Sequence, residues 1–159
     1  MIIKLNEAEQ LIAKFIAKER YDSARKKNIK DLKMGKQSNW ETDLEGIGGE
    51  IAACKYFGVY PEYVLTPVGA TAFSKFDLIT KKGNKVDVKT TKYENGRLLA
   101  TKKKKRGECD AYVLVIGEFP TYRLVGWATD VELLDPKNIR DFGHGEGYAL
   151  DQDQLRKFS

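Results

Sequence analysis

The chain has 159 residues, of which 42% are hydrophobic and 32% are charged, and its formal net charge is +5. This length favours a single domain, residues 1–159, with a substantial core. One histidine and two cysteines nearly exclude a structural zinc site and favour reduced thiols over a disulfide framework. No run of 18 apolar residues is present, so no membrane partner is expected, and the N-terminus lacks a signal-peptide core, which favours the cytoplasm.

The first predicted element is a helix over residues 5–27, whose start is indicated by the capping-box spacing of Asn6 and Glu9. One stripe of this helix is apolar and is expected to face the core: Ala8, Leu11, Ile12, Phe15 and Ile16. The opposite face is basic: Lys14, Lys18, Arg25, Lys26 and Lys27. It could contact nucleic acid, although a solvated face is the more ordinary interpretation.

A second helix is predicted from Ser38, which forms another capping box with Glu41, to Phe57, and Gly58 is its expected C-cap. The residues expected to be buried share one stripe: Trp40, Leu44, Ile47, Ile51 and Cys54. Three internal glycines are unfavourable in a helix. Gly46, Gly48 and Gly49 could permit close contact with a sheet, or could break the helix into two pieces.

Two glutamates of this second helix are candidate site residues. Glu50 lies three residues after Ile47 and four before Cys54, so it is near the buried face, where an unpaired carboxylate is unfavourable. Glu45 could take the same part, but an ordinary surface pair is the better interpretation of that residue. We therefore favour Glu50.

Residues 76–91 predict a β-hairpin with strands 76–80 and 85–90 around the pair Gly83-Asn84. In the second strand, period-two alternation places Val86 and Val88 on one face and Asp87 and Lys89 on the other. Paired strands lie about 4.8 Å apart, so Asp77 is expected beside Asp87, with Lys89 next to both.

This charged cluster has two interpretations. Two carboxylates and an ammonium are costly to bury on one sheet face unless something binds there, and a divalent metal with a phosphate would resolve that cost. The alternative is a salt-bridged triad on a solvent-facing side of the sheet.

The rest of the chain predicts strands at 97–101, 110–117, 121–127 and 148–150, a short helix opening at Thr129 or Asp130, and a final helical turn from Asp151 to Phe158. Residues 110–117 form a continuous apolar run, which favours a buried central strand. Residues 81–106 carry eleven Lys and Arg against two Asp and Glu. This basic segment suits a polyanion, and its run Lys102–Arg106 could be disordered until it meets a phosphate backbone.

An aspartate, then an Asp-x-Lys about ten residues later on the next strand, after a helix that carries a glutamate, resembles the PD-(D/E)xK nuclease superfamily. The resemblance covers roughly Leu44 to Val131. Asp-x-Lys also occurs at residues 31–33 and 135–137, but only residues 87–89 lie in an apolar strand after a hairpin. Phe76 stands where the name of the motif has proline.

The resemblance implies an α/β fold: one restriction-endonuclease-like domain with a central mixed sheet flanked by helices on both sides. It implies a Mg²⁺-dependent deoxyribonuclease, with Mn²⁺ as a substitute, acting as an endonuclease similar to small phage-type members. DNA is the implied partner, and the family allows a homodimer. No nucleotide cofactor is expected.

The resemblance also implies roles for individual residues. The catalytic residues would be Glu50, Asp77, Asp87 and Lys89. Asp77, Asp87 and the Val88 carbonyl would hold one or two metal ions, with Glu50 in support. Lys89 would position the attacking water or stabilise transition-state charge. The residues expected to grip flanking phosphates are Lys92, Arg97, Lys102, Lys103, Lys104, Lys105 and Arg106.

Three alternatives remain at this stage. One is a nucleic-acid-binding protein that keeps the fold without catalysis, and another is a basic structural or interaction protein whose hairpin charges are incidental. The third, within the same chemistry, is a structure-selective Holliday-junction resolvase, and RNA remains open as the substrate. The sequence does not choose the substrate structure, the DNA sequence preference or the oligomeric state.

Overall fold

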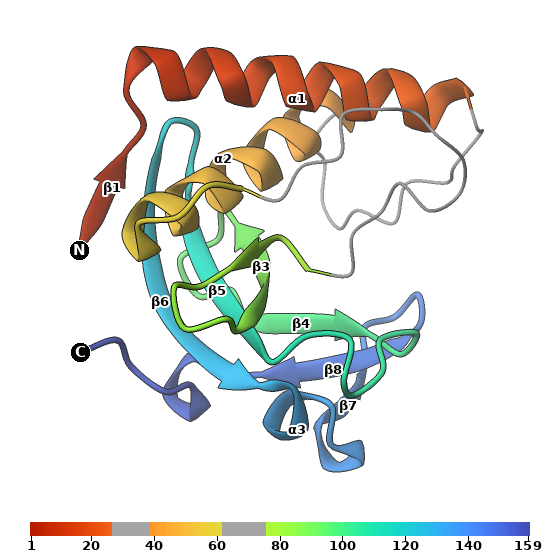
Figure 1. The fold of residues 1–159 in the computed structure, drawn as a ribbon. Helices are drawn as coiled ribbons and strands as arrows, with labels where there is room; N and C mark the ends of the chain where they lie inside the picture. Colours follow the sequence, from red (N-terminus) through yellow and green to blue (C-terminus); the bar gives the residue numbers. More distant parts are fainter. Residues whose placement is uncertain (27–38, 62–75) are drawn as a thin grey trace.

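The computed structural model describes residues 1–26, 39–61 and 76–159. Two long helices precede most of the strands, and all elements are drawn in Figure 1. The helices are α1 (Glu7–Lys26), α2 (Asn39–Phe57) and the short α3 (Asp130–Leu133). The strands are β1 (Ile2–Lys4), β2 (Leu78–Ile79), β3 (Lys85–Thr91), β4 (Leu98–Thr101), β5 (Ala111–Glu118), β6 (Thr121–Thr129), β7 (Ile139–Asp141) and β8 (Glu146–Leu150). In the described residues, one 3₁₀ turn follows α3, at Pro136–Asn138, and another follows β8, at Gln152–Gln154.

The strands form two sheets. A five-stranded sheet has the order β1-β6-β5-β3-β2, and a three-stranded antiparallel sheet has the order β4-β8-β7. Within the larger sheet, β3 and β5 are parallel and the other pairs are antiparallel. The parallel pair arises because the chain leaves this sheet after β3, forms β4 in the smaller sheet and then returns. The predicted mixed sheet in an α/β fold is thus confirmed.

The two faces of the larger sheet are covered by different layers. Val113 and Val115 of β5 pack with α1 and α2, whereas Tyr112, Leu114 and Ile116 pack against the smaller sheet and α3. Figure 1 shows the two long helices on one side of the curled sheet and β4, β8 and α3 on the other. The expectation of helices on both faces is therefore wrong for the long helices, because the second face is covered mainly by strands.

The capping box that begins α1 is confirmed, since Glu9 N donates to Asn6 Oδ1 and Asn6 N donates to Glu9 Oε2. The predicted apolar stripe is mostly wrong. Leu11, Ile12 and Phe15 are each more than half exposed, and the buried residues are Ala13, Ile16 and Ala17. Small residues face the core because α1 lies close against α2. The predicted basic residues Arg25, Lys26 and Lys27, and the cap Ser38, lie outside the described side chains.

Helix α2 is continuous through its glycines, and these bring it against the sheet. A Cβ on Gly48 would lie 2.0 Å from the Tyr122 hydroxyl, and one on Gly49 would lie 2.0 Å from Thr90 Oγ1. Close contact is therefore the correct one of the two interpretations. The helix ends where Gly58 adopts a φ of 66°, as its predicted C-cap role requires.

Several boundaries differ from the predictions. The first hairpin strand shortens to two residues, and the final helical turn is only Gln152–Gln154, after which Arg156 bridges to Trp127. β1 and β7 have three residues each and were not predicted, since such short segments carry no detectable period. Among the described residues, no helix is both long and apolar enough to cross a membrane.

Candidate active site

The predicted hairpin forms and sets the register of the site. Leu78 pairs with Val86 and Ile79 with Lys85, so the antiparallel register continues to place Asp77 opposite Asp87. The turn closes through Thr80 N to Asn84 O at 2.9 Å, and Gly83 adopts a φ of 88° that favours glycine. The prediction that Asp77 lies beside Asp87 is thus confirmed.

Asp77 sits where the pairing of β2 with β3 ends, and its side chain extends the ladder. Its N–H donates to Val86 O at 2.8 Å, and its Oδ2 accepts from Val88 N at 2.7 Å. In a strand, the N–H and C=O of one residue point to the same side. The Val88 carbonyl therefore faces the edge at which the Asp77 carboxylate lies.

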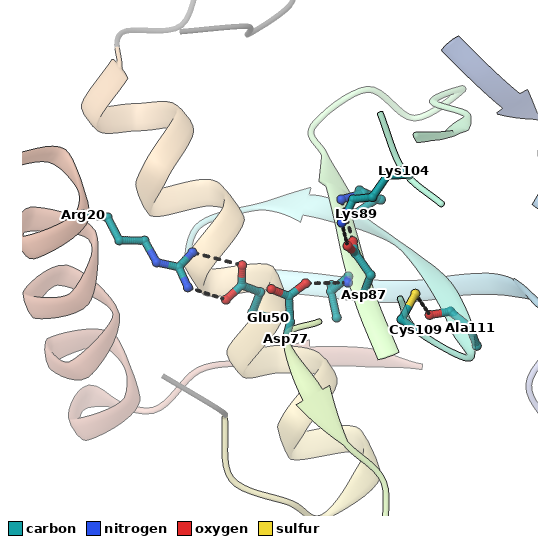
Figure 2. A network of polar contacts seen from close by, with 9 residues as sticks. Arg20, Glu50, Asp77, Asp87, Lys89, Lys104, Cys109 and Ala111 are labelled. Carbon is teal, nitrogen blue, oxygen red and sulfur yellow. Dashed lines mark hydrogen bonds and ion pairs between the residues drawn. The ribbon is translucent and has the colours of Figure 1, made fainter. Parts of the chain in front are cut away.

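Glu50 approaches the same edge from α2. Figure 2 shows the Asp77 carboxylate next to Glu50, whose own carboxylate oxygens are turned to Arg20. Glu50 is 7% exposed, and Arg20 of α1 holds it from the other side, with guanidinium nitrogens 3.2 and 3.4 Å from Oε1 and Oε2. Arg20 was missed by the sequence prediction, although its spacing from Ile16 and Ala17 on a helix could have indicated an inward position.

Asp87 is the most enclosed acid of the group, with a side chain only 5% exposed. Lys89 Nζ lies 2.5 Å from its Oδ1, and Lys104 Nζ lies 2.7 Å from its Oδ2 (Figure 2). Lys104 donates a hydrogen bond to Oδ2, and Lys89 is the ion partner of Oδ1. One carboxylate thus carries two ammonium groups.

The electrostatics of the cluster are those of crowded acids. Burial raises the pKa of Asp77 well above its usual range, and the charges of Glu50 and Asp87 raise it further, against the lowering effect of the Val88 N–H. Burial lowers the pKa of Lys89, but the charge and hydrogen bond of Asp87 and the charges of Asp77 and Glu50 outweigh burial and raise it. Lys89 is therefore a firmly protonated cation at neutral pH.

Glu45 has a different role from Glu50. Its Oε2 accepts from Phe119 N at 3.2 Å and from the Tyr122 hydroxyl at 3.4 Å. Burial raises the pKa of Glu45 and the Phe119 N–H opposes that shift. Glu45 thus satisfies polar groups at the β5–β6 turn, and the geometry agrees with the choice of Glu50 as the glutamate beside Asp77.

The seven predicted phosphate-binding residues separate into groups. Lys104 points into the site, and Arg106 donates to the carbonyls of Leu134 and Val131 at the end of α3. Both residues thus have partners within the fold, and their predicted contact with phosphate stays a prediction. Lys102 lies 4.0 Å from Glu146, Lys92 and Arg97 lie over the rings of Tyr93 and Phe142, and Lys103 and Lys105 are exposed.

The run Lys102–Arg106 takes a defined path in the β4–β5 loop rather than needing a ligand to order it. Its turns are closed by Lys104 N to Thr101 O at 3.1 Å and by Glu108 N to Lys105 O at 3.3 Å. No local pattern indicates the inward position of Lys104, because five adjacent basic residues outside regular structure have no period that separates inward from outward side chains.

The oxygen ligands at this edge suit a hard divalent cation such as Mg²⁺. Asp77 forms no ion pair within the described chain, and its raised pKa shows that its charge is poorly compensated there. However, no three His, Cys, Asp or Glu side chains of the described ranges form a ready metal group, because Glu50 is turned to Arg20 and Asp87 to two lysines. The chemistry of the ligands fits, and Asp87 would join them only when a lysine moves.

The chain matches no protein-family model and no curated protein sequence. Its function is therefore argued from the geometry of these residues.

Proposed function

We propose that this protein is a Mg²⁺-dependent deoxyribonuclease that hydrolyses phosphodiester bonds, of the PD-(D/E)xK endonuclease type. The observation that carries the proposal is the meeting of Glu50 of α2 with Asp77, Asp87 and Lys89 of the hairpin. Three of these four residues are acids. A fold that needed only stability would rarely place them together, because neighbouring carboxylates repel each other when water is excluded.

The residues of the cluster have different roles in the proposed reaction. Glu50, Asp77 and the Val88 carbonyl supply oxygen ligands at the edge of β3. A divalent cation held there would neutralise phosphate charge and make a water molecule more acidic. Lys89, whose pKa is raised, acts as a proton-bearing cation that orients the attacking water or stabilises the phosphate in the transition state, rather than as a general base.

The surroundings of the site suit a polyanion. Lys103 and Lys105 are exposed on the loop that also brings Lys104 to Asp87. Lys92 lies shortly after Lys89, at the end of β3. Such cations would bind the phosphates flanking the reacting one, and binding of this kind weakens as salt rises.

The test is cleavage of supercoiled plasmid and of single-stranded DNA with Mg²⁺ or Mn²⁺. We expect Asp87→Asn to lower the rate about 100-fold or more, since it removes a charge that faces the reaction. The matched control is Asp135→Asn, in the other described Asp-x-Lys, where Asp135 caps a 3₁₀ turn remote in sequence from the hairpin. Equal rates in all three proteins, or cleavage that persists in EDTA, would contradict the proposal.

A second candidate is a nucleic-acid-binding protein of this fold without catalysis. The observation that favours it is that both oxygens of Asp87 are occupied by lysines. It predicts salt-dependent DNA binding, unchanged by Asp87→Asn and by divalent metal, with no cleavage of plasmid, single-stranded DNA or a four-way junction. The junction substrate also separates a structure-selective resolvase from a general endonuclease.

A further inference from the structure

The β4–β5 loop places one lysine of its basic run apart from its neighbours. Lys104 is 22% exposed and reaches Asp87, whereas Lys103 and Lys105 on either side are exposed. Lys104 thus belongs to the site by position, although nothing in the motif of the hairpin requires it.

The single negative charge of Asp87 is paired with two positive charges. Lys89 lies on β3 beside it, and Lys104 is the second ammonium on the same carboxylate. A carboxylate that coordinates a divalent cation loses most of its attraction for an ammonium, and the two cations repel each other. One lysine must therefore move away from Asp87 when a metal binds there.

Lys104 is the lysine that is able to leave. Lys89 lies in a strand paired with β5 through Lys89 and Leu114, and its ammonium is attracted by Asp77 and Glu50 as well as by Asp87, so it keeps acidic neighbours in the cluster. Lys104 is held by turn hydrogen bonds in a loop between two sheets, and its long side chain can swing without a change in strand pairing. An ammonium released from Asp87 would remain beside the site, where it could pair with a phosphate of bound DNA.

We propose that Lys104 is a substrate-phosphate-binding residue of this site, which pairs with Asp87 in the metal-free protein and transfers to a DNA phosphate when a divalent cation binds. The inference rests on the proposed function and adds to it an exchange of partners by Lys104. It couples metal binding to DNA binding, and both can be measured without catalysis. Metal binding must displace Lys104 from Asp87, and DNA binding then includes a contact between Lys104 and a phosphate.

The first measurement is Mn²⁺ binding by isothermal titration calorimetry. Lys104→Met removes the competing ammonium, so we expect Mn²⁺ to bind about fivefold more tightly than in the wild type. Lys103→Met is the matched control and should keep the wild-type affinity. Thermal unfolding of Lys104→Met confirms that the fold is kept, and Lys104→Arg, which retains the charge, should restore the wild-type affinity.

The second measurement is binding of a labelled duplex with and without Ca²⁺, a probe chosen to limit cleavage. Lys104→Met should weaken binding about fivefold when Ca²⁺ is present and have little effect without it. Lys103→Met should weaken binding equally in both conditions, as a simple surface contact does.

The outcomes separate the inference from the proposed function. If wild-type protein binds metal and cleaves DNA, but Lys104→Met matches Lys103→Met in both assays, the inference is overturned and the nuclease stands. Weaker Mn²⁺ binding in Lys104→Met also overturns it, because Lys104 would then support the metal site. If the wild type binds no divalent cation, both are overturned.

Discussion

Two glutamates of helix α2 occupy surroundings of opposite kinds. Glu45 accepts hydrogen bonds from the Phe119 N–H and the Tyr122 hydroxyl, so its charge is used by the β5–β6 turn. Glu50 is held by Arg20 and lies next to the Asp77 carboxylate, whose pKa its charge raises. Folding alone explains the first arrangement but leaves the second unfavourable. An acid that lies next to another acid therefore indicates a cation site more strongly than burial of an acid does.

The largest expected effect is on cleavage. Glu50→Gln should lower the rate in saturating Mg²⁺ about 100-fold, because it removes one of the charges that face the metal. Glu45→Gln keeps an oxygen that can accept from Phe119 N, and it should change the rate less than about threefold. The measurement is single-turnover cleavage of a plasmid. Equal losses in the two variants would erase the distinction between these glutamates.

The packing between α2 and the sheet gives the next effect. In Gly49→Ala the new Cβ would lie 2.0 Å from Thr90 Oγ1, so we expect the free energy of unfolding to fall by about 2–3 kcal/mol. No atom lies within 4 Å of a Cβ placed on Gly46, so Gly46→Ala should raise the free energy of unfolding by about 0.8 kcal/mol. Urea unfolding measures both. A gain in stability in both variants would show that helix propensity alone decides.

Replacing Glu45 should lower the free energy of unfolding more than replacing Glu50. Glu45→Ala leaves the Phe119 N–H and the Tyr122 hydroxyl without this acceptor, and we expect a loss of about 2 kcal/mol. Glu50→Ala removes an ion pair with the partly exposed Arg20 but also relieves repulsion at Asp77, so its loss should be less than half as large. Urea unfolding in EDTA at neutral pH compares them. A larger loss in Glu50→Ala would make Glu50 primarily a structural residue.

The smallest effect is a gain. The pKa of Asp77 is raised in the folded protein by burial and by the charges of Glu50 and Asp87, so ionisation of Asp77 disfavours folding. Stability from this group is lost as pH rises from its unfolded pKa of about 3.9 through the higher folded pKa. Asp77→Asn keeps an acceptor for Val88 N and should raise the free energy of unfolding by about 1 kcal/mol at pH 7.

The control for this gain is the pH profile in EDTA. The advantage of Asp77→Asn should shrink steadily as pH falls toward 4, where wild-type Asp77 becomes protonated. An advantage that is constant from pH 4 to pH 8 would mean that the repulsion at Asp77 is not its cause.

Much of the site could be predicted from local patterns. The Gly83-Asn84 turn determines the hairpin, the hairpin determines the register, and the register brings Asp77 to Asp87. The stripe of α2 likewise placed Glu50 near the buried face. Each of these steps depends on neighbours in the chain, which is why sequence reasoning succeeds with them.

The remainder depends on tertiary packing. The sequence favoured Leu11 and Phe15 for the buried side of α1, but the core uses Ala13 and Ala17 because the two long helices lie close together. The inward course of Lys104 is decided by a loop between two sheets, which has no period. The smaller sheet pairs β4 with β8, and pairing between segments so distant in sequence leaves no local pattern.

The different layers on the two faces of the larger sheet have a consequence for the two cysteines. Both thiols are buried and neither is in a disulfide; Cys54 packs with the helical layer and Cys109 with the layer of the smaller sheet. A reagent that alkylates thiols reaches each of them only when its own layer opens. The alkylation rate of each cysteine therefore reports the opening of one side of the larger sheet. A ligand bound at the β3 edge, which both layers share, would lower both rates, whereas a ligand bound to the smaller sheet alone would lower only the rate of Cys109.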